Sequence, residues 1–299
     1  MAGRKESEKP IIFEHLFNQR YDYETREFTF STITQDEIQE AIVNLAGDMG
    51  LRLKPGNPAN FLKDYLRSWS RNYMWPTALH QAKFTARQVY GGSRVFDFVP
   101  YASNQVEPFP DEFPLPNEAA MHELEAISLP SAARALGRQG ESWLIQVIVQ
   151  QRVLQTHFAL FSKLKAVDLF HLQNGMKGTP EIDAVFLLNF MHEGVLSQAL
   201  ITLEAKNDDP ILPDQIRAQV AYIAKQCQIR PALQDIKYVV PIAAATRHSV
   251  HPRTIQLHEM EPISVLEAAA AQDAHQSHTI SLRTMSSVGY TFRPQIAGI

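Results

Sequence analysis

The sequence predicts an α/β (α+β) protein, in which a mixed sheet flanked by helices follows a smaller N-terminal domain. In the second half of the chain, apolar and β-rich runs alternate with helical patterns in the order helix, three strands, helix, strand. The first hundred residues instead show short helices followed by a glycine-tipped hairpin. Between them, Tyr101 to Asn117 contains four prolines, which is typical of a linker. We therefore expect two domains, residues 1–117 and 118–299.

Size and composition agree with this division. The chain has 299 residues, of which 45% are hydrophobic and 20% charged, enough for one large core or two modest ones. The single cysteine, Cys227, excludes an intrachain disulfide, and Met1 to Pro10 is too charged for a signal peptide. Apolar runs such as Tyr238 to Ala245 are far shorter than the roughly 20 residues needed to cross a bilayer. We expect a cytoplasmic protein with no membrane partner.

The N-terminal elements begin with a helix predicted from about Asp36 to Asp48. Thr34 and Glu37 have the spacing of a capping box and precede apolar residues at helical spacing. Asn57-Pro58 then provides an N-cap followed by proline at the first helical position. The second helix that begins there carries Lys63, Arg67 and Arg71 on one face. Met74-Trp75-Pro76 precedes a short third helix.

A hairpin is predicted next, with Phe84 to Tyr90 and Val95 to Val99 flanking Gly91-Gly92. Helices followed by such a hairpin resemble a winged helix-turn-helix, in which one helix enters the major groove and the wing touches the backbone or minor groove. The alternative is an ordinary α+β scaffold with arginines on its surface.

Charge favours a polyanion partner for this region. The whole chain carries a net charge of -4, but Gly50 to Phe96 holds eight Lys or Arg against one Asp, a net charge of +7. A solvated basic face is the other explanation. Arginine pairs bidentately with guanine and glutamine with adenine. The candidate contacts to double-stranded DNA are therefore Arg87, Gln88, Arg94, Lys63 and Arg67.

After the linker, the pattern predicts a helix of about 15 residues through Trp143 and Leu154. The further predicted elements are strands at Ala166 to Leu169, Ile182 to Leu188 and Ala199 to Ala205, a helix from Asp214 to Cys227, a strand at Ile236 to Ile242 and a helix near Ala268 to Ala271. The last thirty residues give the weakest pattern.

Charged residues mark the ends of two predicted strands. Pro180-Glu-Ile-Asp183 opens one, and Leu203-Glu-Ala-Lys206 closes the next. Side chains alternate along a strand, so Glu204 and Lys206 share a face while Ala205 points to the core. If the two strands pair, Asp183 lies opposite Glu204.

Two neighbouring carboxylates repel each other, and a divalent cation removes the conflict. Mg²⁺ prefers oxygen ligands, so Asp183, Glu204 and the carbonyl of Ala205, with a phosphate oxygen, make a suitable shell. Lys206 is then placed to orient or deprotonate the attacking water, or to neutralise the phosphate.

At these residues the sequence resembles the PD-(D/E)XK nuclease superfamily, over about Glu141 to Ala243. The resemblance implies Asp183 and Glu204 as metal ligands and Lys206 as the catalytic lysine. Glu141 occupies the place of a further acid that members often carry on the preceding helix. One departure is that Glu181 follows Pro180 and the aspartate comes two residues later. Either could be the ligand, and Asp183 is preferred because it lies deeper in the strand.

The helix after the second strand adds Gln215, Gln219 and Tyr222 at spacings of about one and two turns. In related nucleases a glutamine there often binds DNA or the active-site lysine, so Gln215 and Gln219 are candidate DNA contacts. The alternative is a polar stripe on a surface helix. His248 and His251, in a proline-flanked segment without cysteine partners, are weak zinc candidates.

Together these features resemble a type II restriction endonuclease, because no ATPase or methyltransferase motif is present. The resemblance implies Mg²⁺-dependent hydrolysis of double-stranded DNA that leaves 5′-phosphate and 3′-hydroxyl ends. Cutting both strands of a symmetric site predicts a homodimer. Two alternatives remain: a structure-specific repair or recombination nuclease, and a non-catalytic winged-helix DNA-binding regulator.

Overall fold

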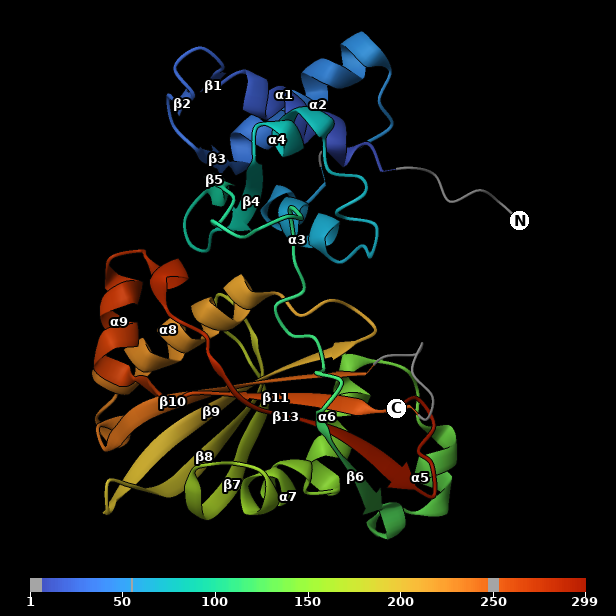
Figure 1. Ribbon diagram of the computed structural model, residues 1–299, viewed down its shortest axis with the longest axis vertical. Coiled ribbons are helices and arrows are strands. Elements are labelled where there is room, and N and C mark those ends of the chain that lie inside the picture. The colour runs from blue at the N-terminus through green and yellow to red at the C-terminus, as the bar shows by residue number, and fades with distance from the viewer. Residues whose placement is uncertain (1–6, 55, 247–252) are drawn as a thin grey trace. The chain divides into compact units, whose positions relative to one another are not determined.

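The computed structural model describes residues 7–54, 56–246 and 253–299 of a mixed α/β protein (Figure 1). The chain divides into two compact units, Met1–Asp111 and Glu112–Ile299. The division falls within the proline-rich segment, a few residues before the predicted boundary after Asn117.

The N-terminal unit combines short helices with two small sheets. Its elements are α1 (Lys9–Asn18), β1 (Tyr21–Asp22), β2 (Glu27–Phe28), β3 (Thr32–Thr34), α2 (Gln35–Met49), α3 (Phe61–Leu66), α4 (Thr77–Gln81), β4 (Phe84–Gln88) and β5 (Arg94–Pro100). The strands β1 and β2 form an antiparallel pair, and a second antiparallel sheet has the order β3-β5-β4. The predicted hairpin is therefore present as β4 and β5.

The helix α2 begins as the sequence predicts. The Thr34 hydroxyl accepts a hydrogen bond from the Glu37 backbone N–H at 3.4 Å, and the Glu37 carboxylate accepts one from the Thr34 N–H at 2.7 Å. This capping box satisfies two backbone donors that the first helical turn leaves without partners. Gly50 closes the helix with φ of 67°, in the left-handed region that favours glycine.

Aromatic side chains fill the core of the N-terminal unit. The ring of Phe13 on α1 lies 5.1 Å from Phe61, 4.9 Å from Trp75 and 5.3 Å from Phe96. Because these residues come from α1, α3, β5 and the loop before α4, one aromatic cluster ties the helices to the sheet.

The C-terminal unit is built on one large sheet. Its elements are β6 (Ala120–Glu125), α5 (Ser131–Leu136), α6 (Glu141–Gln150), α7 (Val153–Leu160), β7 (Lys165–Met176), β8 (Ile182–His192), β9 (Val195–Asn207), α8 (Pro213–Ile229), β10 (Ile236–Thr246), β11 (Ile255–Met260), β12 (Ile263–Ser264), α9 (Val265–Asp273) and β13 (Thr284–Arg293).

The sheet is mixed and has the order β6-β13-β11-β10-β9-β8-β7, with β12 added to β10. The strands β7, β8 and β9 are antiparallel neighbours, and β9 runs parallel to β10. The edge strand β6 pairs in parallel with β13, so a segment that directly follows the linker is held by the end of the chain (Figure 1).

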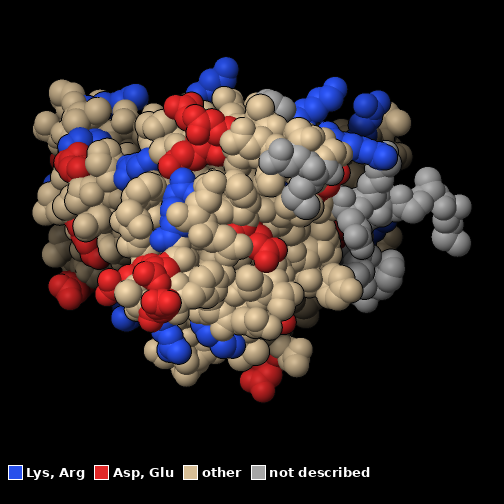
Figure 2. Space-filling model, turned by 90° about the horizontal axis from the view of Figure 1, so that it is seen from above, with Lys and Arg blue, Asp and Glu red and all other residues tan. Residues whose placement is uncertain are grey.

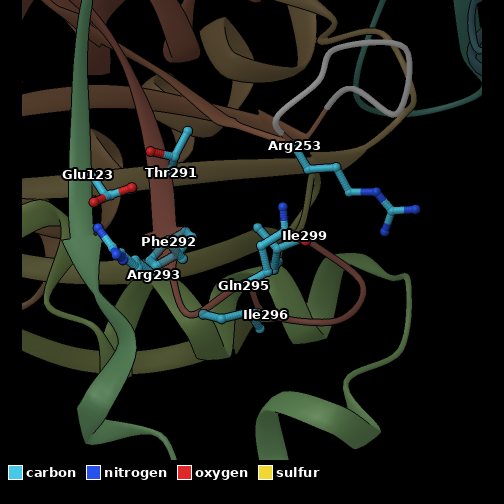
Figure 3. Close-up of a pocket in the computed structure, with 8 residues that line it drawn as sticks. All are labelled: Glu123, Arg253, Thr291, Phe292, Arg293, Gln295, Ile296 and Ile299. Carbon is cyan, nitrogen blue, oxygen red and sulfur yellow. The ribbon is translucent and has the colours of Figure 1, made fainter.

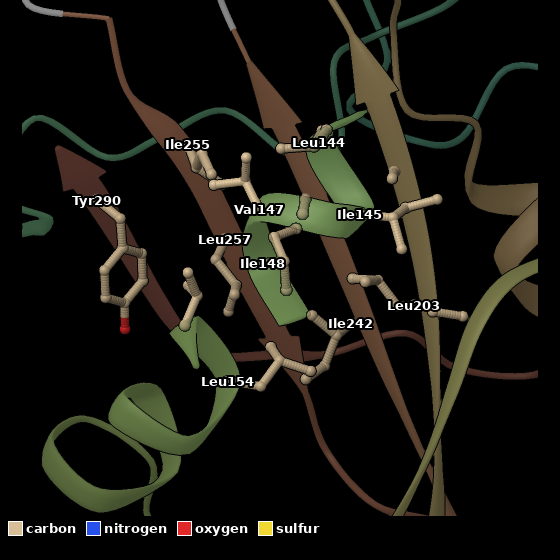
Figure 4. Packing of buried hydrophobic residues seen from close by; sticks show 14 of the residues in the cluster. Leu144, Ile145, Val147, Ile148, Leu154, Leu203, Ile242, Ile255, Leu257 and Tyr290 are labelled. Atoms are coloured by element: carbon tan, nitrogen blue, oxygen red, sulfur yellow. The ribbon is translucent and has the colours of Figure 1, made fainter. Parts of the chain in front are cut away.

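Helices cover both faces of this sheet. On one face, α6 directs Leu144, Val147 and Ile148 onto the strands, where they pack with Leu203 and Ile242 (Figure 4). On the other face, α8 and α9 bury a second apolar cluster. The central strands are buried from both sides, which explains their almost continuous apolar sequence.

The structure differs from the sequence prediction in several elements. The single helix predicted through Trp143 and Leu154 is two helices, α6 and α7, with Arg152 between them in the left-handed region at φ of 52°. The strands β6, β11 and β13 were not predicted. No helix in the described ranges combines the length and apolarity needed to span a membrane.

Candidate active site

Neighbouring strands bring the two predicted carboxylates together. The antiparallel register of β8 and β9 pairs Ala184 with Leu203, and Asp183 and Glu204 lie directly beyond that pair. The Asp183 Oδ2 accepts a hydrogen bond from the Ala205 backbone N–H at 2.7 Å. The side chain of Ala205 is buried in the core, as predicted. The pairing of the two strands thus fixes Asp183 beside the Glu204-Ala-Lys206 segment.

Lys206 lies at the centre of the cluster. Its Nζ is 2.5 Å from Glu204 Oε1 and 3.0 Å from Glu141 Oε1, and it donates to the Ala205 carbonyl at 3.1 Å. The side chain of Lys206 is only 3% exposed and that of Glu204 is fully buried. A surface ion pair, the usual explanation for Glu-x-Lys, therefore does not describe this pair.

Glu141 also belongs to the cluster, although it lies 65 residues before Lys206 in the sequence. It stands in the first turn of α6, directly after Gly140. The packing of α6 against β9 holds that turn close to the strand end (Figure 4). Because the Glu141 side chain is 37% exposed, the cluster opens to solvent on this side.

Gln219 on α8 completes the cluster. Its Nε2 donates to Glu204 Oε2 at 2.5 Å and to the Glu181 carbonyl at 2.8 Å. Gln215, one turn earlier, is also buried, so the two glutamines do not form a surface stripe. The Glu181 side chain is exposed, and its backbone is what Gln219 contacts. Of the two possible acids, Asp183 is the one beside Glu204.

Burial and mutual repulsion shift the protonation of the site. Burial raises the pKa of Asp183 to about 7, helped by the charges of Glu204 and Glu141 and opposed by Lys206 and the Ala205 N–H. Burial alone would lower the pKa of Lys206, but the three carboxylates outweigh it and raise that pKa well above its usual value. The ammonium is therefore the charge that holds the acids together.

The donor set suits a hard divalent cation. The half-buried Asp183 carboxylate and the buried Glu204 carboxylate beside it, together with the Ala205 carbonyl, are oxygen ligands of the kind that Mg²⁺ prefers. Among the described residues, no three His, Cys, Asp or Glu side chains are arranged to hold a metal ion by themselves. A site here would depend on the main-chain carbonyl and on water.

The residues predicted to contact DNA in the N-terminal unit differ in exposure and in their bonding partners. Arg87 pairs with Asp97 at 2.9 Å across the β4–β5 hairpin. Gln88 is buried, and its amide donates to the Val95 carbonyl at 2.8 Å, which argues against a role in reading bases. Arg67 lies 4.0 Å from Asp64 and remains 41% exposed.

The other two predicted contacts, Lys63 on α3 and Arg94 at the start of β5, are half-buried. On the face shown in Figure 2, Lys and Arg side chains stand in separate groups with acidic side chains between them.

Two exposed aromatic residues were missed by the sequence analysis. Trp69 and Tyr73 follow α3 and are 55% and 92% exposed. The sequence shows both residues close to Arg67. It does not distinguish them from the aromatic residues that fill the core of the same unit. Exposed aromatic rings next to arginine are typical of surfaces that stack on bases.

A separate cavity of about 230 Å³ lies beside β13 and the end of the chain (Figure 3). It is lined by Glu123, Arg253, Thr291, Phe292, Arg293, Gln295, Ile296 and Ile299. None of these residues belongs to the cluster around Lys206. His248 and His251, the weak zinc candidates, lie outside the described residues.

Comparisons with family models, with characterised proteins and with solved structures found no match to this chain.

Proposed function

We propose that this protein is a Mg²⁺-dependent endonuclease that hydrolyses double-stranded DNA, of the PD-(D/E)XK type and most similar to type II restriction enzymes. The observation that carries the proposal is the convergence of Asp183, Glu204, Lys206 and Glu141 from β8, β9 and α6. These residues are up to 65 positions apart in the chain, yet hydrogen bonds and ion pairs join them in one cluster.

Each residue has a role that its contacts support. Asp183, Glu204 and the Ala205 carbonyl would hold the ion, which when bound stabilises charge on the scissile phosphate and acidifies a water. The Ala205 N–H fixes the orientation of Asp183, and Gln219 fixes that of Glu204. Lys206 carries N–H donors suited to a phosphate oxygen or to the attacking water. Glu141, at the open side, would bind the ion directly or through water.

The N-terminal unit is proposed as a winged-helix-like DNA-binding domain. Its order is helix, three short strands, helices and hairpin, and β3 pairs with the second hairpin strand, β5. In a winged helix-turn-helix, a hairpin of this kind serves as a wing beside the recognition helix. We assign Arg67 and Arg94 as DNA contacts. Gln88 is not included, because its amide is bound to the backbone.

A cleavage assay tests the proposal. Purified protein incubated with plasmid and Mg²⁺ should give discrete fragments with 5′-phosphate ends. Asp183→Asn and Lys206→Ala should each slow cleavage by at least about 100-fold, since one removes a ligand charge and the other the donor to the phosphate or water. Both variants should still bind DNA in Ca²⁺.

The matched controls are Asp273→Asn and Lys225→Ala, which break an acid–lysine pair of 2.6 Å that is partly exposed at α8 and α9. They should cleave as the wild type does. A smear of products would favour a structure-specific nuclease. Binding to DNA without cleavage in Mg²⁺ or Mn²⁺ would favour a non-catalytic regulator and overturn the proposal.

The same assay addresses oligomeric state. One cluster can cut one strand, so a double-strand break at a symmetric sequence requires two copies of the chain. We propose a homodimer on DNA, and sedimentation of the protein with a cleaved duplex in Ca²⁺ should show two chains per site.

A further inference from the structure

The ammonium group of Lys206 lies where the proposed divalent ion would bind. Its three neighbours are Glu204 Oε1, Glu141 Oε1 and the Ala205 carbonyl, at 2.5, 3.0 and 3.1 Å. The proposed function assigns two of these groups, Glu204 and the Ala205 carbonyl, to a divalent ion, and Glu141 would bind that ion directly or through water. An ammonium group has three N–H donors. Two of these contacts are hydrogen bonds, to Glu141 Oε1 and to the Ala205 carbonyl, and the contact with Glu204 Oε1 is an ion pair.

A divalent ion and this ammonium cannot share the same carboxylate oxygen at short range. Lys206 is 3% exposed and Glu204 is fully buried, so solvent screens their charges poorly. An ion binding at Glu204 would therefore meet a neighbouring positive charge in a poorly screened environment. One of the two cations has to leave Glu204.

The surroundings of Glu204 indicate which contact gives way. Gln219 fixes Oε2 of Glu204 from α8, so the carboxylate is held in place when its Oε1 partner changes. Glu141, the other acid bound to Lys206, is 37% exposed and lies at the open side of the cluster. Lys206 can thus keep Glu141 as a partner while its Nζ moves away from Glu204 toward solvent.

We propose that Lys206 is an internal counter-ion of the metal-free site, and that a divalent ion displaces it from Glu204. This inference rests on the proposed metal site. Before the ion arrives, the lysine neutralises the buried acids and keeps them assembled. Displacement then directs the ammonium toward the open side, where a phosphate would lie. Binding of the ion and contact of Lys206 with Glu204 are consequently coupled, and each must weaken the other.

The first experiment measures metal affinity without DNA. Calorimetric titration of Ca²⁺ into Lys206→Met should show affinity at least about 10-fold higher than in the wild type, because the competing cation is absent. Lys225→Met is the matched control, since it removes a lysine paired with an acid on the same unit, and should change affinity less than twofold. Equal or weaker Ca²⁺ binding by Lys206→Met would overturn the proposal.

The second experiment uses the wild-type protein, so it does not depend on the folding of a variant. Amine acylation followed by peptide mass spectrometry should label Lys206 slowly without metal and several-fold faster with Ca²⁺, while labelling of Lys225 stays constant. Unchanged labelling of Lys206 in protein that binds Ca²⁺ would overturn the displacement but leave the metal site standing. If neither the wild type nor Lys206→Met binds Ca²⁺, the metal site itself is wrong, and displacement falls with it.

Discussion

Asp183 is an acid whose surroundings disfavour its charged form. Its carboxyl is half-buried beside Glu204, and one oxygen is bound to the Ala205 N–H. Burial and the neighbouring acid raise its pKa to about 7. The folded protein therefore holds a proton on this group over a pH range in which the unfolded chain has released it.

This shift predicts a pH dependence of stability in the metal-free protein. The contribution of Asp183 to the free energy of unfolding is fully present below its ordinary pKa of 3.8 and declines as pH rises toward about 7. Asp183→Asn keeps a neutral acceptor for the Ala205 N–H at every pH. We expect this variant to be more stable than the wild type by roughly 1–3 kcal/mol at pH 8, with a smaller difference at pH 5.

Urea unfolding in the presence of EDTA measures this difference directly. Asp273→Asn, which alters an exposed carboxylate, is the control and should show no comparable pH trend. A constant difference between Asp183→Asn and the wild type across this pH range would show that the carboxyl titrates normally in the folded protein.

At the scale of elements, the sequence predicted well those helices and strands that depend on a few neighbouring residues. The capping box of α2, the β4–β5 hairpin and the strands β8, β9 and β10 all appear close to their predicted ranges. Sequence patterns did not predict strands whose formation depends on pairing with residues far away in the chain. The polar strands β6 and β13 are stabilised by pairing with each other across more than 160 residues, which no local pattern reveals.

The candidate site shows the same limit. The alternation rule placed Glu204 and Lys206 together, and adjacent strands brought in Asp183. The bond from Gln219 to Glu204 and the inward orientation of Gln88 depend on how elements pack, so the sequence left both open. The break between α6 and α7 was also hidden, because Arg152 adopts a conformation that its residue type does not predict.

The α2 cap gives a prediction at this scale. Thr34→Ala removes the hydroxyl that accepts from the Glu37 N–H, which should cost about 1 kcal/mol. Hydrogen exchange of the α2 amides should accelerate roughly fivefold. Glu40→Ala changes an exposed side chain of the second turn and should leave exchange unaltered. Equal effects of the two substitutions would mean that the hydroxyl does not stabilise the helix.

At the scale of the whole molecule, the chain forms two units with separate cores. The aromatic core around Phe13 lies within Met1–Asp111, and both apolar clusters of the large sheet lie within Glu112–Ile299. Every residue of the candidate active site belongs to the second unit. A unit with its own core is expected to fold by itself.

This division predicts the behaviour of a fragment comprising residues 112–299. It should fold cooperatively and bind Ca²⁺ as the full chain does, because both faces of its sheet keep their helices. Without the N-terminal unit, its cleavage of DNA should lose sequence preference and show weaker dependence on salt. Circular dichroism, calorimetry and sequencing of fragment ends measure these properties. An unfolded fragment would show that the N-terminal unit is needed for stability.

The hydrogen bond from Ala205 to Asp183 has a consequence for how such a site can change over time. Its donor is a main-chain amide, so it survives exchange of the side chain at position 205 for any small residue that keeps the strand. Mutation can therefore adjust the packing beneath the cluster while the acid above it stays anchored. The scaffold and the chemistry are in this respect free to evolve separately.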